Sequence, residues 1–121
     1  MSEAGFINYK GKEVLLVDFS NTSEHPAFIK TAGEAMALAA PNQPGSLLGL
    51  VDLSGVRLDK DKQATIKKMA AHNRPYMKFI AIVGLRGLRA VILRIMLRLK
   101  KRTNHKVMSS RQDALDWLAG L

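Results

Sequence analysis

The chain alternates short apolar runs with segments of helical periodicity. The first two runs, Phe6–Tyr9 and Glu13–Phe19, flank Gly11, which can take the positive φ of a tight turn, so they predict a β-hairpin. Pro26 then suits a first helical turn, and "PNQPG" supplies the breakers that end the helix. Between them the apolar residues recur at helical spacing: Phe28, Ile29, Ala32, Met36 and Ala39.

The remaining chain continues as strands and helices in turn. The nearly continuous apolar run Ser46–Leu53 predicts a buried parallel strand, and Tyr76–Gly84 predicts another. A more polar helix over Leu58–Asn73 separates them, and "HKVMS" predicts a short last strand before a closing helix, "SRQDALDWLAG". We therefore expect one α/β domain over residues 1–121, with a mostly parallel β-sheet, an N-terminal β-hairpin and about four helices.

The stretch Gly84–Arg102, "GLRGLRAVILRIMLRLKKR", mixes seven Arg or Lys with nine Leu, Ile, Val and Met. As a helix it has one apolar face for the sheet, formed by Leu88, Ile92, Ile95, Met96 and Leu99. A second apolar strip lies between basic residues and consists of Ala90, Leu93 and Leu97. Because an exposed apolar strip on a helix marks a contact, we interpret these three residues as an interface.

Three kinds of partner remain open for this strip. We favour a protein partner, either a second copy of the chain in a homo-oligomer, most simply a dimer, or another protein. A second copy is the simplest, because the strip then needs only a copy of itself to be covered. A lipid or an anionic membrane surface is the alternative, because basic residues flank the leucines. Nucleic acid is disfavoured, because the basic half has few aromatics on which bases stack: Tyr76, Phe79 and Trp117.

The charge of the chain is unevenly distributed. Residues 1–56 hold three Lys against six Asp or Glu, a net charge of −3, whereas residues 57–121 hold sixteen Lys or Arg against four Asp, a net charge of +12. The asymmetry suggests an anionic partner or surface for the second half. The chain has no cysteine, which excludes disulfides and thiolate chemistry. It shows no signal-peptide pattern and no run of the ~20 apolar residues that span a bilayer, so we expect a cytoplasmic protein.

Candidate ligand-binding residues fall at the carboxyl ends of the predicted strands, the edge where α/β sheets usually bind ligands. They are Asp18, Ser20, Asp52, Ser54, Gly84, Arg86, Gly87 and Arg89. Asp18 and Asp52 either meet as a carboxylate pair or each turn the chain locally, and the second explanation is the commoner. In "GLRGLR" the backbone N–H groups at a helix start can receive an anion, although glycines there more often serve tight packing.

No catalytic or metal site emerges from the sequence. His25, His72 and His105 fall at a helix start, a helix end and a strand start, with no common spacing and no nearby cluster of further metal ligands. No nucleophile can be paired with a base. We therefore expect a protein that is not an enzyme and that uses no cofactor and no metal.

The segment "LVDLSGVRLDKDK" resembles the strand–loop–helix of STAS domains. Three further pieces are similar to the SpoIIAA-like, or STAS/SEC14-type, family of small bacterial proteins: "VDFSN", "NRPYMKFIAIVGLRGLRAVIL" and "DALDWL". The resemblance spans roughly residues 9–119 and implies a STAS/SpoIIAA-like fold. The SEC14 part of the family label implies, by analogy, a lipid or another amphipathic anionic ligand.

The chain departs from this family at the phosphorylation motif. Signalling STAS proteins carry a serine in an Asp-Ser-Ser-Gly motif that a kinase phosphorylates, whereas Asp59–Lys62 reads Asp-Lys-Asp-Lys. Ser54 lies upstream and Thr65 lies within the helix, so neither takes that place. We therefore expect a non-catalytic regulatory or protein-interaction module without the phosphoserine switch. The alternative is a carrier or sensor of an amphipathic anionic ligand, or peripheral membrane association through the basic helix 85–102.

Overall fold

The computed structural model describes residues 3–85, 92 and 104–121. Within these residues it contains five strands and three α-helices, which confirms the α/β class. The fourth predicted helix falls outside the described residues apart from Gly84, Leu85 and Ile92. In chain order the elements are β1 (Glu3–Tyr9), β2 (Lys12–Asp18), α1 (His25–Ala39), β3 (Leu47–Asp52), α2 (Lys60–Asn73), the 3-10 turn η1 (Arg74–Tyr76), β4 (Met77–Val83), β5 (His105–Met108) and α4 (Arg111–Ala119).

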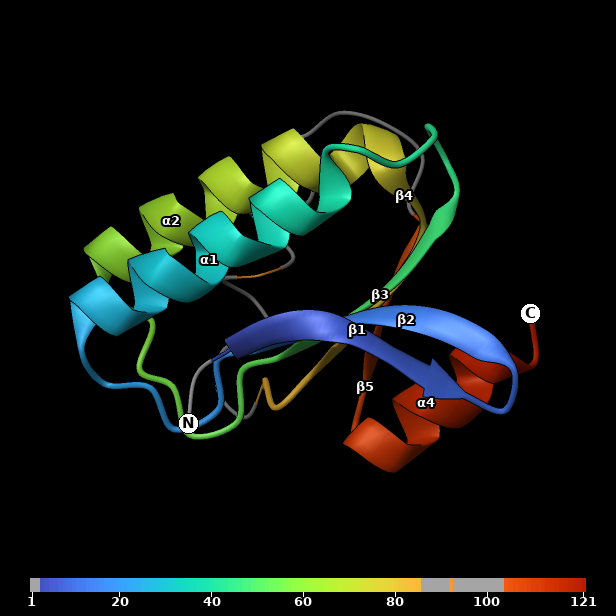
Figure 1. Cartoon of the computed structure of the whole chain (residues 1–121). Helices are drawn as coiled ribbons and strands as arrows, with labels where there is room; N and C mark the ends of the chain where they lie inside the picture. The colour runs from blue at the N-terminus through green and yellow to red at the C-terminus, as the bar shows by residue number, and fades with distance from the viewer. Residues whose placement is uncertain (1–2, 86–91, 93–103) are drawn as a thin grey trace.

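The strands form one sheet in the order β1-β2-β3-β4-β5 (Figure 1). β1 is antiparallel to β2, and every other neighbouring pair is parallel, so the sheet is mostly parallel as predicted. The β1–β2 connection is a two-residue turn in which Lys10 and Gly11 have φ values of 50° and 83°. Positive φ at both positions defines the type I′ turn, whose twist matches that of a hairpin. The predicted hairpin is therefore confirmed.

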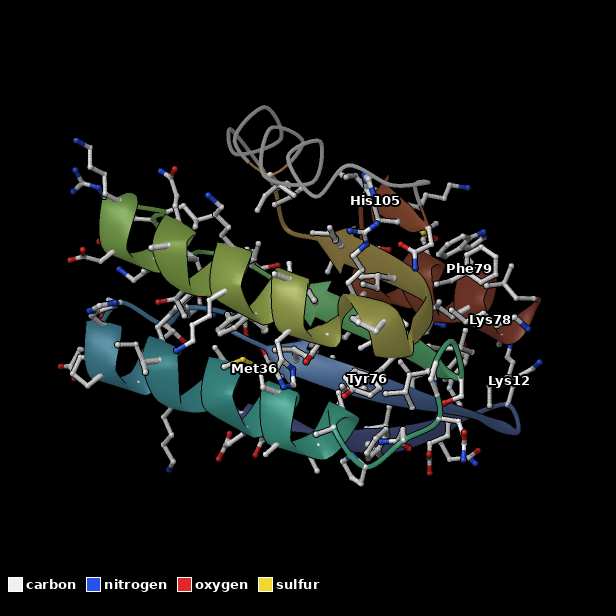
Figure 2. All side chains as sticks on the ribbon, turned by 90° about the horizontal axis from the view of Figure 1, so that it is seen from above. Lys12, Met36, Tyr76, Lys78, Phe79 and His105 are labelled. Atoms are coloured by element: carbon white, nitrogen blue, oxygen red, sulfur yellow. The ribbon has the colours of Figure 1, made fainter. Side chains whose placement is uncertain are left out.

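Helices α1 and α2 lie side by side over one face of the sheet (Figures 1 and 2). The core beneath them includes Phe19 and Phe28, both fully buried, with stacked rings whose centroids are 4.2 Å apart. Ile92 belongs to the same core and is 1% exposed, which agrees with its predicted place on the sheet-facing side of its segment. The other members of that predicted face lie outside the described residues: Leu88, Ile95, Met96 and Leu99.

Helix α4 covers the opposite face of the sheet, and its core is smaller. Ala114 and Leu118 are fully buried there against side chains of the three central strands: Val14, Leu48, Leu50, Ala81 and Val83. At the margin of this core, Trp117 is partly buried and meets the ring of Phe79 edge-on, with centroids 5.8 Å apart. Side chains thus alternate between two unequal cores along each central strand.

The starts of α2 and α4 are fixed by side chains that cap free backbone N–H groups. The Asp59 carboxylate accepts a hydrogen bond from the N–H of Lys62 at 2.9 Å, and the Ser110 hydroxyl accepts one from the N–H of Asp113 at 3.1 Å. Asp59 also explains why α2 begins at Lys60 rather than at the predicted Leu58, because a capping residue lies just outside the helix.

Candidate functional site

Asp18 and Asp52 meet at the carboxyl edge of the sheet. They are register partners at the ends of the parallel strands β2 and β3. Arg111, the first residue of α4, reaches both of them: its Nη2 lies 2.7 Å from Asp52 Oδ2 and 3.2 Å from Asp18 Oδ2. Its Nε also donates to Asp52 Oδ2 at 3.0 Å. We refer to Asp18, Asp52 and Arg111 as the carboxylate clasp.

The remaining carboxylate oxygens of the clasp are also occupied. Asp18 Oδ1 accepts hydrogen bonds from the backbone N–H and the hydroxyl of Ser20, at 2.9 and 2.5 Å. Asp52 Oδ1 accepts one from the backbone N–H of Ser54 at 2.9 Å. The two aspartates therefore both meet as a pair and form local turns, as the two explanations from the sequence proposed. One oxygen of each carboxylate stabilises the turn that follows its strand, and the other oxygen binds Arg111, which lies between the two aspartates.

Burial and hydrogen bonding act in opposite directions on the ionisation of the clasp. Burial disfavours the charged form of the Asp52 carboxyl, but hydrogen bonds from Ser54 and Arg111 outweigh it, so the pKa of Asp52 lies below its ordinary value. For Arg111, burial lowers the pKa and the hydrogen bonds to Asp52 and Asp18 raise it, with a net upward shift. The pKa shifts of both groups therefore favour the charged forms of the Asp52 carboxylate and the Arg111 guanidinium.

This arrangement makes Asp52 unsuited to act as a general base. A general base needs an accessible oxygen and a pKa close to the working pH. The Asp52 side chain is 7% exposed, its oxygens are engaged, and its pKa is shifted away from neutrality. What the clasp does is join the first turn of α4 to the ends of β2 and β3 across one face of the sheet.

Beside the clasp lies an open polar groove with a volume of about 830 Å³. Its lining combines the end of β5 with residues that follow β3, β4 and β5: Ser54, Gly55, Gly84, Leu85, Val107, Met108 and Ser109. Gly84 has a φ of 80°, and a Cβ there would lie 2.3 Å from the backbone nitrogen of Ser54, so only glycine allows the two loops to approach so closely. Tight packing therefore accounts for Gly84.

The predicted ligand-binding residues thus separate into three groups. Asp18, Ser20 and Asp52 belong to the clasp and its turns, and Ser54 and Gly84 line the polar groove. The other predicted site residues lie outside the described residues, as does the whole predicted interface: Arg86, Gly87, Arg89, Ala90, Leu93 and Leu97.

Among the described strands this edge has no topological switch point. In open α/β sheets, ligands bind where the strand order reverses and neighbouring loops diverge to opposite faces. Here the five described strands follow one another from β1 to β5 without a reversal. The crossover helices between β2, β3 and β4 both lie on one face, so their loops bend the same way.

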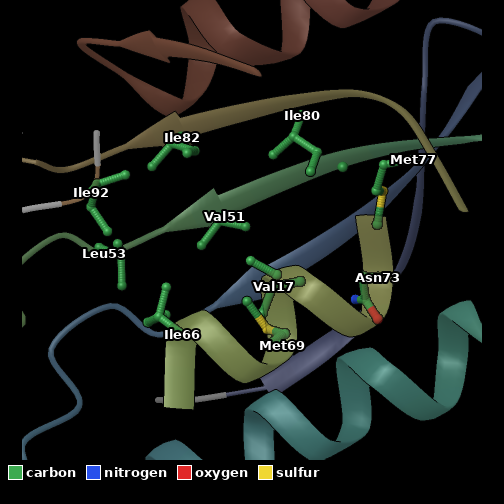
Figure 3. Close-up of a pocket in the computed structure, with 12 residues that line it drawn as sticks. Val17, Val51, Leu53, Ile66, Met69, Asn73, Met77, Ile80, Ile82 and Ile92 are labelled. Atoms are coloured by element: carbon green, nitrogen blue, oxygen red, sulfur yellow. The ribbon is translucent and has the colours of Figure 1, made fainter. Parts of the chain in front are cut away.

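An apolar cavity of about 40 Å³ lies between α2 and the sheet (Figure 3). Side chains that line it come from β2, β3, β4 and α2, together with Ile92; examples are Val17, Val51, Ile66, Met69 and Ile82. Gly49 leaves part of this space open, and a Cβ there would lie 3.2 Å from the sulfur of Met77. The cavity thus extends along the strands from Leu53 and Ile92 towards Asn73 and Met77 (Figure 3).

Among the described residues there is no group of three or more His, Cys, Asp or Glu that could hold a metal ion. No helix formed by this part of the chain is long and apolar enough to cross a membrane. Comparison with family models, curated proteins and solved structures finds no match to the chain. Function therefore has to be argued from the site itself.

Proposed function

We propose that this protein is a non-catalytic regulatory or protein-interaction module of the STAS/SpoIIAA-like type, working as a homo-oligomer or docked on another protein. The observation that carries the proposal is the carboxylate clasp. The acidic residues that the sequence offers for chemistry at the carboxyl edge are bound to Arg111, Ser20 and Ser54. Their role is to fix α4, which leaves the surface of the domain, rather than a reaction centre, as its working part.

The start of α2 supports a module without a phosphoserine switch. The position that carries the phosphorylated serine in the signalling relatives corresponds to the Asp59–Lys62 stretch, where Asp59 itself caps the helix. Lys62 Nζ lies 3.1 Å from Asp59 Oδ2, and the Lys62 side chain is 5% exposed. By the resemblance, a carboxylate and its cation stand where the signalling STAS proteins carry the phosphorylated serine, and no hydroxyl is present in this stretch.

Native mass spectrometry of the purified protein tests the proposal, because it reports the oligomeric state and any bound lipid together. An interaction module gives a dimer or higher oligomer, or a monomer that co-purifies with a defined protein, and carries no lipid. A monomer that carries a stoichiometric lipid contradicts the proposal. The variant with Leu93→Glu and Leu97→Glu then tests the strip at residues 90–97, since partnerless buried carboxylates break an interface.

A second candidate function is binding of an amphipathic anionic ligand, and the apolar cavity is the observation that favours it. The cavity reaches Ile92, which lies within the basic stretch that continues to Arg102. Its volume of about 40 Å³ is far below the roughly 150 Å³ that admits benzene in an engineered apolar cavity. An acyl chain therefore fits only if α2 or its neighbours move away from the sheet.

A matched pair of substitutions on α2 tests this candidate. Ala70 lines the cavity, whereas the adjacent Ala71 is exposed. If a fluorescent fatty acid binds in the cavity, Ala70→Leu abolishes the fluorescence change and Ala71→Leu preserves it. Equal binding by the two variants, or no binding by the unmodified protein, removes the cavity as a ligand site.

A further inference from the structure

The outer edge of β1 is the longest free edge of the described sheet. β1 has β2 on one side only, and its pairing runs without a register shift from Glu3 opposite Asp18 to Tyr9 opposite Lys12. Figure 1 shows β1 at the margin of the sheet, with no other described element beside it in the sheet plane. The opposite edge strand, β5, has only four residues, compared with seven in β1.

The hairpin turn determines which backbone groups of β1 face outward. In a two-residue turn the C=O of Tyr9 accepts from the N–H of Lys12, so these two residues form a hydrogen-bonded pair. Because such pairs alternate along an antiparallel ladder, the other residues of β1 bonded to β2 are Ile7, Gly5 and Glu3. The N–H and C=O groups that point away from β2 therefore belong to Ala4, Phe6 and Asn8, and no described residue hydrogen-bonds them.

This edge lacks the usual protection against pairing. In natural proteins a proline, a lysine or a bulge in an edge strand often prevents it from pairing with another strand. The sequence of β1, "EAGFINY", contains no Pro and no Lys, and its continuous register leaves no bulge. A seven-residue strand of this kind is a template for another strand.

We propose that β1 pairs with β1 of a second copy of this chain, antiparallel about a two-fold axis at Phe6, so that two five-stranded sheets become one continuous sheet. The pairing joins Phe6 to Phe6 and Ala4 to Asn8 of the second copy, and supplies about six backbone hydrogen bonds. The proposal rests on the interaction module proposed above and names its partner and its surface.

Charge and side-chain pattern make β1 complementary to itself. In this register Glu3 lies opposite Tyr9 of the second copy and next to its Lys10. Both charged side chains are exposed, and the Lys10 ammonium also pairs with Asp116 of its own chain. The two-fold axis repeats the acid–base contact at the other end of the strand. At the centre the two partly buried Phe6 side chains become neighbours on the face that α1 covers.

A single-cysteine experiment tests the register directly, because the chain has no cysteine of its own. Phe6→Cys places one thiol of each copy at the two-fold axis, where the Cα atoms of a hydrogen-bonded pair are about 5.5 Å apart, within the range of a disulfide. We expect mild oxidation to give a covalent dimer in high yield. Glu3→Cys is the control, because its two copies are separated by six positions, about 20 Å along the strand, and it should stay monomeric.

A proline substitution tests the same edge without an added cross-link. The N–H of Ala4 points away from β2, so Ala4→Pro keeps the hairpin ladder and removes bonds only from the proposed interface. We expect Ala4→Pro to convert the dimer into a folded monomer, and Ala4→Gly, which keeps the N–H, to remain a dimer. If Ala4→Pro does not fold, the comparison of disulfide cross-linking between Phe6→Cys and Glu3→Cys tests the pairing of β1 without it.

Two results overturn the edge pairing and leave the proposed interaction module standing. The first is an unmodified protein that stays monomeric at high concentration and gives no Phe6→Cys dimer, which leaves docking on another protein. The second is a dimer that survives Ala4→Pro and is lost when Leu93 and Leu97 are both changed to Glu, which moves the interface to the segment after β4.

Discussion

The two faces of the sheet are covered by different physical means. Under α1 and α2, packing is almost entirely apolar and is centred on rings and branched chains with no exposure, such as Phe19 and Phe28. Under α4 the apolar cluster is small, and two charged side chains of the helix, Arg111 and Asp116, also join it to the sheet. Hydrophobic burial involves no titrating group, whereas ionic contacts depend on the protonation of both partners and are screened by salt.

The two polar attachments of α4 also differ from each other. The two carboxylates of the clasp are largely shielded from water, since the Asp52 and Asp18 side chains are 7% and 17% exposed, whereas Arg111 is 39% exposed. About one and a half turns further along α4, Asp116 accepts from the Tyr9 hydroxyl at 2.6 Å and from Lys10 Nζ at 3.2 Å, but its side chain is 48% exposed. Exposed ion pairs contribute little, so the clasp is the attachment on which α4 depends.

The largest effect is expected on the apolar face. Phe28→Ala removes a ring with no exposure and leaves Phe19 without its stacking partner. Loss of a buried phenylalanine costs about 3–5 kcal/mol, a large share of the stability of a small domain. Urea unfolding followed by circular dichroism measures the change. A loss below about 1 kcal/mol would show that this core is not what holds α1 on the sheet.

Arg111→Ala should have the next largest effect. The substitution leaves Asp52 buried next to Asp18 with no cation between them, and an unpaired buried polar or charged group costs about 1–3 kcal/mol. Arg111→Lys should recover part of the loss, because an ammonium keeps the charge but cannot reproduce the two bonds that Arg111 makes to Asp52. Equal urea midpoints for the unmodified protein and Arg111→Ala would remove the clasp as a source of stability.

The contribution of Asp52 to the pH dependence of stability should be smaller, and it should be confined to acid. Folding lowers the pKa of Asp52 below the ordinary value of 3.8, so its contribution is complete above that pH and is lost as the pH falls through the lower pKa of the folded state. We expect Asp52→Asn to be less stable at neutral pH and to lose less stability than the unmodified protein below about pH 4. Parallel curves of unfolding free energy against pH would contradict this.

Much of the fold can be predicted from local sequence patterns, whereas the complete clasp cannot. The apolar runs at β2 and β3 predict strands, and parallel strand ends predict that Asp18 and Asp52 share one edge. Arg111 lies 59 residues from Asp52 in sequence, and nothing in its own segment singles it out. It joins the site because α4 crosses to the other face and returns its first turn to the strand ends, which only the tertiary structure specifies.

The polar groove contains a second feature that the sequence does not predict, a contact between two loops. "DLSGV" and "GLRGLR" predict loops with glycine, but not that Gly84 lies directly against the backbone of Ser54. That contact depends on the register of β3 with β4, in which Asp52 pairs with Val83. The close approach of two loops requires glycine at position 84, as the packing explanation predicts, and a part for Gly84 in ligand binding stays a prediction.

Hydrogen exchange of the unmodified protein and Arg111→Ala, at the same pH, tests most directly whether the two faces are held by different means. We expect the amides of α4 to lose protection in Arg111→Ala while those of α1 and α2 keep it, because the clasp touches only the α4 face. Unchanged protection of α4, or an equal loss on both faces, would show that α4 is held by its apolar core and that the clasp does not fix the helix.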